Sequence, residues 1–424
     1  IGHWDEALRP EIDALVAGQT SSFKFLGYEP DTASYHVAAN VYALTSREDP
    51  FPNVVLESFD AGVPVVAFNG SGGGAKFASS SGGRVVPMED FKAFAAEILF
   101  FINHPEVAQD LGRQASALVD REYAFRSYLF DLCKLSEINL PRISVIVPNY
   151  NYAKYIGERL DSIVGQSLPI YELIILDDAS TDDSVVEIKK WLTKNKIECR
   201  LILNQENSRN VFDQWAKGVA EATGDYVWIA EADDLSAPRF LETVIAPMER
   251  DNKIAISYCE SQQIDGRSQL LSNDYQAYRE DVCGNHWTVP YVADGDEEIV
   301  KFMAVKNTIP NVSGVLLRRE AVASVFADSL SQIRALTKAG DWLTYIKIMK
   351  GAKVAFSPRP LNFHRRHAGS VIGGSHAGRL LEEIEIVQKL VAEEYPLPEN
   401  IAQQADLYIE MLRSQFNIQN RVSL

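Results

Sequence analysis

The stretch that decides the fold is Tyr226-Val227-Trp228-Ile229-Ala230, which Glu231-Ala232-Asp233-Asp234 follows at once. The apolar residues come after a Gly224-Asp225 turn signal and predict a strand that is buried on both faces. Three carboxylates then stand together at the carboxyl end of this strand. Because like charges repel, a positive partner is expected beside them. A divalent cation that holds a phosphate-bearing ligand suits the position, since hard cations prefer carboxylate oxygens. The stretch therefore predicts an enzyme that uses an activated phosphate compound.

Composition and charge indicate an acidic globular chain with more than one domain. The chain has 424 residues, 46% hydrophobic content and a formal net charge of -17. This length is enough for two or three full cores. The acidic balance argues against nucleic acid as the main partner, because nucleic-acid phosphates bind to basic surfaces. A nucleotide in a local pocket remains compatible with it.

The cysteine spacing and the N-terminal sequence bear on the cellular compartment of the protein. The four cysteines are far apart and fit no metal-ligand spacing, which suits small buried residues in a reducing cytoplasm. The sequence shows neither a membrane-spanning run nor a signal peptide. The chain begins at Ile1 within a helical pattern, so we expect a piece of a longer protein. The expected location is cytoplasmic.

Apolar runs alternate with helical patterns in two blocks that meet near residues 136–141. Expected strands of the first block are VYALT (41–45), PVVAF (64–68) and RVVPM (84–88). Those of the second block are ISVIV (143–147), ELIIL (172–176), RLILN (200–204) and YVWIA (226–230). This β-α-β rhythm predicts an α/β protein with mostly parallel sheets. Residues 261–300 are expected to be irregular and polar, and residues 379–415 to be helical.

Polar residues follow three strands of the second block. Pro148, Asn149 and Tyr150 follow the first strand, Asp177 and Asp178 the second, and the acidic triplet the third. Ligands of parallel sheets bind beyond the carboxyl ends of the strands, so these residues are expected to form one site. An Asp there can accept a hydrogen bond from a nucleobase, while the triplet holds a metal on a diphosphate. Taken singly, the Asp string also suits a helix cap and the triplet a solvated loop.

The second block resembles a family 2 glycosyltransferase of the GT-A fold, from about Arg142 to Ile372. The resemblance rests on VPNYNYAKYIGERLDSI (147–163), ILDDASTDDS (175–184) and GDYVWIAEADD (224–234). It implies that Asp177 or Asp178 recognises the base of a nucleotide sugar. It also implies that Asp233 and Asp234 reach the ribose and a Mn²⁺ or Mg²⁺ ion. Glu231 stands where the family often has Asp.

Further site residues are expected on either side of the acidic triplet. Asp341 precedes an apolar helical run, and the resemblance implies that it is the general base; a helix cap is the plainer alternative. In FHRRHAGS (363–370), His367 matches the family's metal-proximal histidine better than His364 does. Arg209 and Lys217 are candidates for phosphate contacts, although a solvated helix face explains them as well.

The first block resembles the C-terminal, Rossmann-like half of a family 4 glycosyltransferase of the GT-B fold, from about residue 25 to residue 128. The matching stretches are residues 25–68 and 82–98. The resemblance implies nucleotide binding by Asp49 and Glu57, with Glu57 on the ribose; a helix-terminal acid is the alternative. Lys76 stands where an acid is common, and the family's upstream phosphate clamp and acceptor domain are missing. We therefore expect this block to be inactive as it stands.

Together the resemblances imply a GT-B half over residues 1–135, a GT-A domain over 142–375 and a helical segment over 376–424. The implied reaction moves a sugar from a UDP- or dTDP-linked donor to a glycan or lipid-linked acceptor, with inversion, in cell-surface polysaccharide synthesis. A non-catalytic nucleotide-sugar-binding or scaffold module is the alternative. A nucleotidyltransferase would show a Gly-rich loop after residue 147. The helices after Arg379 either dock at the inner membrane face or pack on the catalytic domain. The donor sugar and the oligomeric state stay open.

Overall fold

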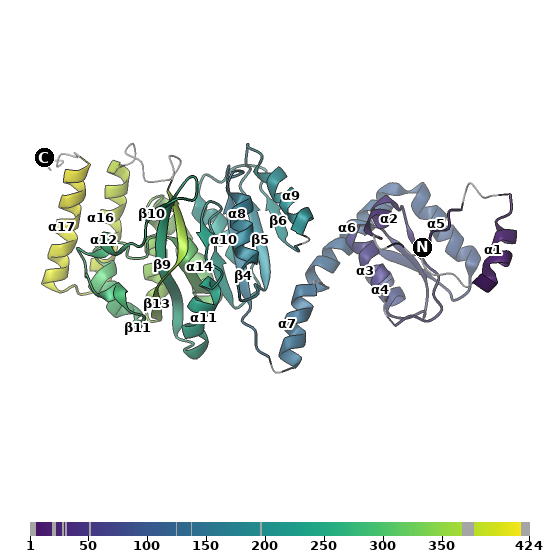
Figure 1. Ribbon diagram of the computed structural model, residues 1–424, viewed down its shortest axis with the longest axis horizontal. Coiled ribbons are helices and arrows are strands. Elements are labelled where there is room, and N and C mark those ends of the chain that lie inside the picture. The colour runs from purple at the N-terminus through teal and green to yellow at the C-terminus, as the bar shows by residue number, and fades with distance from the viewer. Residues whose placement is uncertain are drawn as a thin grey trace. The chain divides into compact units, whose positions relative to one another are not determined.

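The structure is a computed structural model, and it describes residues 6–18, 23–27, 29, 32–50, 52–123, 125–136, 138–195, 197–366 and 377–416 (Figure 1). The chain divides into two compact units, Ile1–Tyr128 and Leu129–Leu424. Each unit has its own sheet and its own hydrophobic cores. Across the described ranges, no helix is long and apolar enough to cross a membrane.

The first unit is built on a three-stranded parallel sheet of β1 (Tyr42–Leu44), β2 (Val65–Phe68) and β3 (Gly83–Val86). Every residue of the central strand β2 is buried, because alternate side chains enter different cores. Val65 and Ala67 pack with α3, α4 and α6, while Val66 and Phe68 pack with α5 and α6. The helices and turns are η1 (Glu6–Leu8), α1 (Arg9–Leu15), α2 (Ala33–Ala38), α3 (Asn53–Asp60), α4 (Gly73–Ser81), α5 (Phe91–Asn103) and α6 (Pro105–Glu122). The parallel α/β prediction for this block is confirmed.

The second unit is built on a ten-stranded sheet whose main path is β11-β13-β9-β12-β7-β4-β5-β6. The strands β6, β5, β4 and β7 are parallel neighbours, and β12 then runs antiparallel to both β7 and β9. The strands are β4 (Ile143–Asn149), β5 (Glu172–Asp177), β6 (Arg200–Leu203), β7 (Tyr226–Ile229), β8 (Leu235–Ser236), β9 (Ile254–Asp265), β10 (Leu270–Ser272), β11 (Tyr291–Asp294), β12 (Val315–Arg318) and β13 (Lys353–Arg366). All four strands predicted for this block are present, and the sheet is mostly parallel at this end.

Helices cover both faces of the central strands β4, β5 and β7, so these strands are mostly apolar. Ile146 of β4 enters the core with α10, α14 and α15, whereas Val145 and Val147 enter the core with α8, α9 and α11. The approach of α10 to the sheet requires a glycine, because a Cβ on Gly218 would lie 2.4 Å from Ile146 Cγ2. The helices and turns are α7 (Phe125–Leu135), α8 (Ile156–Val164), α9 (Ser184–Asn195), α10 (Val211–Glu221), α11 (Phe240–Arg250), α12 (Gln276–Arg279), η2 (His286–Thr288), α13 (Gly295–Glu298), η3 (Ile299–Met303), η4 (Val312–Gly314), α14 (Arg319–Ala335), α15 (Gly340–Met349), α16 (Ala377–Glu394) and α17 (Glu399–Gln415).

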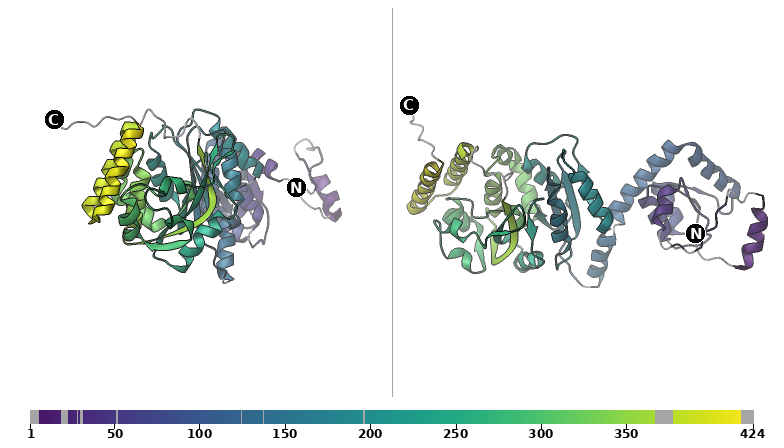
Figure 2. Two further views of the ribbon diagram at one scale, coloured as in Figure 1. Left: turned by 60° about the vertical axis from the view of Figure 1, so that its left-hand side comes forward. Right: turned by 45° about the horizontal axis from the view of Figure 1, so that its top comes forward.

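The last two helices belong to the core of the second unit. Figure 2 shows α16 and α17 side by side against this unit, and both bury apolar side chains in the same core as α10 and α15. Pro396 and Pro398 separate them, since proline cannot continue a helix and Pro398 stands just before α17. The buried residues of the two helices include Leu381, Ile384, Val387, Val391, Ile401, Tyr408, Ile409 and Leu412.

The expectation of an irregular, polar stretch over residues 261–300 is wrong. The strand β9 continues through Asp265, and β10, α12, β11 and α13 follow it. Polar residues of this region are buried because distant side chains satisfy them: Asn362 donates to Ser261 at 3.0 Å, and Arg279 pairs with Glu260. A polar composition therefore concealed a strand of the central sheet.

Candidate active site

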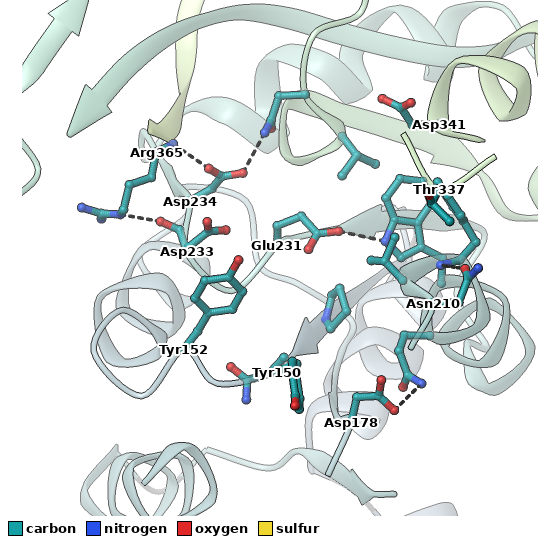
Figure 3. A pocket seen from close by; sticks show the side chains of 18 of the residues that line it. Tyr150, Tyr152, Asp178, Asn210, Glu231, Asp233, Asp234, Thr337, Asp341 and Arg365 are labelled. Atoms are coloured by element: carbon teal, nitrogen blue, oxygen red, sulfur yellow. Dashed lines mark hydrogen bonds between the residues drawn. The ribbon is translucent and has the colours of Figure 1, made fainter. Parts of the chain in front are cut away.

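A cavity of about 550 Å³ lies at the carboxyl ends of β4, β5 and β7 in the second unit (Figure 3). Its volume is in the range of pockets that hold small organic ligands and cofactors. Most of the residues singled out from the sequence line it: Pro148, Asn149, Tyr150, Asp178, Arg209, Glu231, Asp233, Asp234, Asp341 and His364. Asp177 and Lys217 do not line it, and His367 falls outside the described residues. The convergence of three strand ends has thus produced one shared cavity.

The adjacent carboxylates Asp177 and Asp178 have different surroundings. Asp177 is buried and accepts hydrogen bonds from Ser180 N at 2.9 Å, Ser180 Oγ at 2.7 Å and Asn149 Nδ2 at 2.7 Å. It therefore joins the loops after β4 and β5. Asp178 lines the cavity, where Ser208 Oγ donates to it at 2.7 Å and Gln214 Nε2 at 2.9 Å. Of the two residues, Asp178 is the one that can meet a ligand.

Three loops around the cavity hold a non-glycine residue in the left-handed region. The φ angles are 60° at Asn151, 60° at Ala179 and 58° at Arg209, in the loops after β4, β5 and β6. Asn151 Oδ1 accepts the backbone N–H of Thr181 at 2.8 Å, which ties two of these loops together. Such conformations persist only where the surroundings fix them, and they cluster at functional sites.

All three residues of the acidic triplet line the cavity, but Asp234 is also tied into the protein by hydrogen bonds. Asp234 is buried and accepts from Ser313 Oγ at 2.7 Å, Asn311 Nδ2 at 2.9 Å and Arg365 N at 2.8 Å. The backbone oxygen of Asp233 accepts from Arg365 Nε at 2.5 Å, and its side chain lines the cavity (Figure 3). Asp234 therefore anchors the loop that presents Asp233.

Glu231, the first acid of the triplet, is held by tryptophan. Trp215 Nε1 of α10 donates to Glu231 Oε1 at 2.8 Å. Burial raises the pKa of Glu231 to about 8, and the nearby charge of Asp233 adds to the increase. Burial therefore favours the neutral form of Glu231, and a nearby cation would favour the charged form.

Two buried arginines lie beside the acids: Arg159 was not singled out from the sequence, and Arg365 belongs to the FHRRHAGS stretch, whose arginines were expected near the diphosphate. Arg159 of α8 is fully buried, donates from Nη1 to Ser236 Oγ at 2.9 Å and lies 4.8 Å from the Trp228 ring centroid. Burial lowers its pKa to about 10, while Asp234, Asp233 and Glu231 favour its charge. Arg365 is also buried and bridges Asp233, Asp265 and Glu158.

A sequence signal for Arg159 was available. It occupies the buried face of α8 together with Ile156, Leu160 and Ile163, at a spacing where an apolar residue is normal. A charge on such a face needs compensation, and here the nearby charges of the acidic triplet favour the charged form. The positive partner first expected beside the acids is therefore supplied in part by the protein itself.

The donor set fits a divalent cation that shares its coordination with a bound ligand. Within the described ranges, no group of three or more His, Cys, Asp or Glu is placed to hold a metal. Mg²⁺ at nucleotide sites usually takes one or two carboxylates together with substrate phosphates. Asp233, backed by Asp234, offers such a carboxylate at the cavity.

Asp341 lies in the first turn of α15 and lines the cavity on a different wall from the acidic triplet (Figure 3). Ala339 is the residue at the helix cap, so the plain capping role is not the one observed. Asp341 Oδ1 accepts from Trp342 N at 2.8 Å, and Oδ2 accepts from Asn307 Nδ2 at 3.0 Å. Burial raises the pKa of Asp341 to about 6.

Some of the basic residues near the site line the cavity, and others do not. Arg209 is exposed at the cavity rim, and Arg366 of the FHRRHAGS stretch and Lys338, which was not predicted, also line the cavity. Lys217 instead donates from Nζ to Asn204 Oδ1 at 2.6 Å, away from the cavity. His364 Nδ1 lies 2.5 Å from the Tyr275 hydroxyl.

In the first unit, both predicted acids, Asp49 and Glu57, lie close enough to Tyr42 to affect its pKa. Burial raises the pKa of Tyr42, and Glu57 and Asp49 add to the increase. Glu57 Oε2 accepts from Thr32 Oγ1 at 3.3 Å. Asp49 N donates to Ser71 O at 2.7 Å. This close approach of the two backbones requires glycine at position 72, because a Cβ there would lie 1.7 Å from Asp49 O. Lys76 is exposed on α4.

Comparisons with known proteins identify the two parts of the chain. The glycosyl transferase family 2 model matches residues 144–296, and the glycosyl transferases group 1 model matches residues 1–117. The protein EpsE of Bacillus subtilis (strain 168) is 37% identical over 110 residues, which are 26% of this chain and 39% of EpsE. Glycosyltransferase GlyG of Streptococcus pneumoniae serotype 4 is 32% identical over 127 residues, which are 29% of this chain and 41% of GlyG.

The matched regions cover less than half the length of each of these relatives. Among solved structures, that of S. aureus TarS 1-349 in complex with UDP aligns with a TM-score of 0.47 and 18% identity, over 66% of this chain and 76% of that chain. The chain thus carries a glycosyl transferases group 1 segment followed by a glycosyl transferase family 2 domain.

Proposed function

We propose that the second unit is a metal-dependent glycosyltransferase that moves a sugar from a nucleoside-diphosphate sugar to a hydroxyl group. One observation carries the proposal: a single cavity brings together Asp178, Asp233 and Asp341, which come from three distant parts of the chain. A base-recognising acid, a diphosphate-side acid and a carboxylate with a pKa of about 6 are the groups that this transfer needs.

The donor lies with its base near Asp178 and its diphosphate near Asp233. Tyr150, whose side chain is 43% exposed, offers a ring on which the base can stack. The carboxylate of Asp178 accepts the ring N–H of uracil, thymine or guanine, and we favour UDP- or dTDP-linked donors. Asn149 and Ser180 both donate hydrogen bonds to Asp177. Asp177 therefore holds the two loops beside the base subsite in place without lining the cavity itself.

Asp233 and Asp234 would hold Mn²⁺ or Mg²⁺ on the diphosphate. When bound, the ion offsets the negative charge that develops on the leaving nucleoside diphosphate. The side chains of Arg209 and Arg366, at the cavity wall, add positive charge for the phosphates. Arg365 binds the acid-bearing loop at Asp233 O, and Arg159 binds Ser236 just after it.

Asp341 acts as the general base on the acceptor hydroxyl. Asn307 orients its carboxylate through the bond to Oδ2, and a pKa of about 6 leaves it charged at neutral pH but able to take a proton. The activated oxygen then attacks the anomeric carbon from the face opposite the diphosphate, which inverts that centre. A glycan or lipid-linked acceptor of a cell-surface polysaccharide suits this open cavity.

A non-catalytic nucleotide-sugar-binding module is the second candidate. The observation that favours it is the number of hydrogen bonds that Asp178 and Asp234 already make to protein groups. These bonds leave fewer acceptor positions for a ligand. Turnover separates the two candidates.

The test is release of nucleoside diphosphate from UDP-, dTDP- and GDP-linked sugars in the presence of Mn²⁺, with water or simple sugars as acceptor. Asp233→Asn is compared with Asp183→Asn, the same change at an exposed position outside the cavity. We expect a loss of about 100-fold or more for the first variant and less than about twofold for the second. Equal turnover by Asp233→Asn and the wild type would refute the metal role. Failure of the wild type with every donor would favour the non-catalytic module.

A further inference from the structure

Glu383 of α16 places a buried carboxylate against the backbone just before α15. Its side chain is 3% exposed, although it is charged and lies on a helix of the C-terminal segment. Oε1 accepts from Thr337 N at 3.0 Å and from Thr337 Oγ1 at 3.1 Å. Oε2 accepts from Lys338 N at 2.6 Å and from Ala339 N at 3.0 Å. Three successive backbone amides therefore bind one carboxylate.

These amides lie at the start of a helix that has no side-chain cap of its own. The first N–H groups of a helix lack partners within it, and the helix dipole favours a negative charge there. Ala339, the cap residue of α15, has no side chain that can accept a hydrogen bond. Glu383, 44 positions farther along the chain, accepts from the amide of this cap residue and from the two amides just before it. Arg379, one turn earlier on α16, donates to Glu383 at 2.8 Å and holds the carboxylate from outside.

The segment that Glu383 binds is also a wall of the cavity. Thr337, Lys338 and Asp341 all line it (Figure 3). Residues 337–341 therefore connect the amides that Glu383 binds to the Asp341 carboxylate, which is assigned as the base. The helix that carries Glu383 is itself fixed, because Leu381, Ile384 and Val387 are buried in the core.

We propose that Glu383 is a positioning residue for Asp341. By binding the amides of residues 337–339, it sets where α15 begins and so keeps the Asp341 carboxylate directed at the acceptor side of the cavity. The inference rests on the proposed role of Asp341 as the base. It makes the C-terminal helices part of the active-site structure, in addition to their place in the core.

The chemistry of the contact calls for a carboxylate. The hydrogen-bond partners of Glu383 are all donors: three amides, one hydroxyl and the Arg379 guanidinium. Glutamine has the same shape but would turn an N–H₂ group towards donors, and it carries no charge. Glu383→Gln therefore loosens the contact with little change of volume. Glu382→Gln, at the neighbouring exposed position, is the matched control.

The first readout is the split between turnover and donor affinity. We expect Glu383→Gln to lower kcat by about 10- to 100-fold, because small misplacement of a catalytic group has effects of this size. Donor KM and the Kd for the nucleoside diphosphate should stay within about twofold, since α15 does not carry the base-recognising acid. Glu382→Gln should match the wild type. Unchanged kcat would overturn the proposal, and so would a parallel loss of nucleotide affinity, which would mark Glu383 as a general stability residue.

The second readout needs no catalysis. Hydrogen exchange of the intact chain should show the amides of residues 337–339 protected in the wild type and in Glu382→Gln, but exposed in Glu383→Gln. Exchange of β7 amides should be the same in all three proteins. Unprotected amides in the wild type would overturn the positioning role. If the wild type has protected amides but releases no nucleoside diphosphate, the proposed function fails while the contact itself stands.

Discussion

Arg159 and Arg365 hold the acidic triplet together at the level of single residues. Three acids at one strand end would repel one another, and burial would push each towards its protonated form. The two guanidinium groups are themselves buried, and Arg365 binds the backbone of the triplet directly. The acids and the arginines are therefore stable only as a group. A cation that binds together with the ligand would therefore add positive charge to acids that already lie beside two arginines.

Removal of one buried arginine should be costly for folding. We expect Arg159→Met to lower the free energy of unfolding by on the order of 3 kcal/mol, because it leaves buried acids without compensation. Arg239→Met, which removes an exposed arginine paired with Glu242, should cost less than about 1 kcal/mol. Urea denaturation followed by tryptophan fluorescence measures both, since five of the six tryptophans lie beyond residue 129. Similar costs for the two variants would show that Arg159 does not compensate the acids.

Asp341 should set the acid limb of activity. Its pKa is raised to about 6 by burial, so the base form is lost as pH falls through that value. We expect kcat/KM at saturating Mn²⁺ to be level above about pH 7 and to fall about tenfold per unit below about pH 6. Asp341→Asn should be about 10²- to 10⁴-fold slower and should lack this limb. A limb that persists in Asp341→Asn would assign it to another group.

Residue types at the site could be predicted, but their roles could not. Strand ends followed by acids were visible in the sequence, which is why Asp178 and Asp233 were singled out, and the family resemblance pointed to Asp341 at a helix start. Whether an acid meets ligand or protein depends on partners far along the chain. Asp234 is bound by Ser313, which is 79 positions away, and no local pattern reveals this.

At the scale of elements, apolar runs predicted strands well and polar strands poorly. The strands β4, β5, β6 and β7 are short apolar runs, and all were expected. The strand β13 contains two prolines, an asparagine and three arginines, yet it pairs with β9 over much of its length and carries Arg365. Its buried polar side chains are hydrogen-bonded: Asn362 donates to Ser261 Oγ, and the Arg365 guanidinium donates to Asp233 O and Ser268 Oγ.

The helices α16 and α17 belong to the core, and a pair of variants can show this. We expect Ile384→Ala to lower the free energy of unfolding by about 2–4 kcal/mol, because Ile384 is buried and a cavity would remain. Ile386→Ala, on the same helix with a 46% exposed side chain, should cost less than about 1 kcal/mol. Urea denaturation again measures the difference. Equal small costs would mean that α16 contributes little to this core.

At the scale of the whole molecule, the two units differ in how much of a candidate binding site each contains. The second unit supplies every residue that lines its cavity, from Pro148 to Arg366. The first unit matches only a group 1 segment and offers Asp49 and Glu57 near one tyrosine. The central claim is therefore that nucleotide binding belongs to the second unit and depends on a metal at Asp233.

The most direct test is calorimetric titration of the chain with UDP, dTDP, GDP and CMP in Mn²⁺ or Mg²⁺, repeated in EDTA and with Asp233→Asn. We predict that one nucleoside diphosphate binds in the presence of the metal. Its affinity should fall by about tenfold or more in EDTA and in the variant, because the ion joins the carboxylate to the phosphates. Absence of binding across the panel, or binding that EDTA and Asp233→Asn leave unchanged, would contradict the claim.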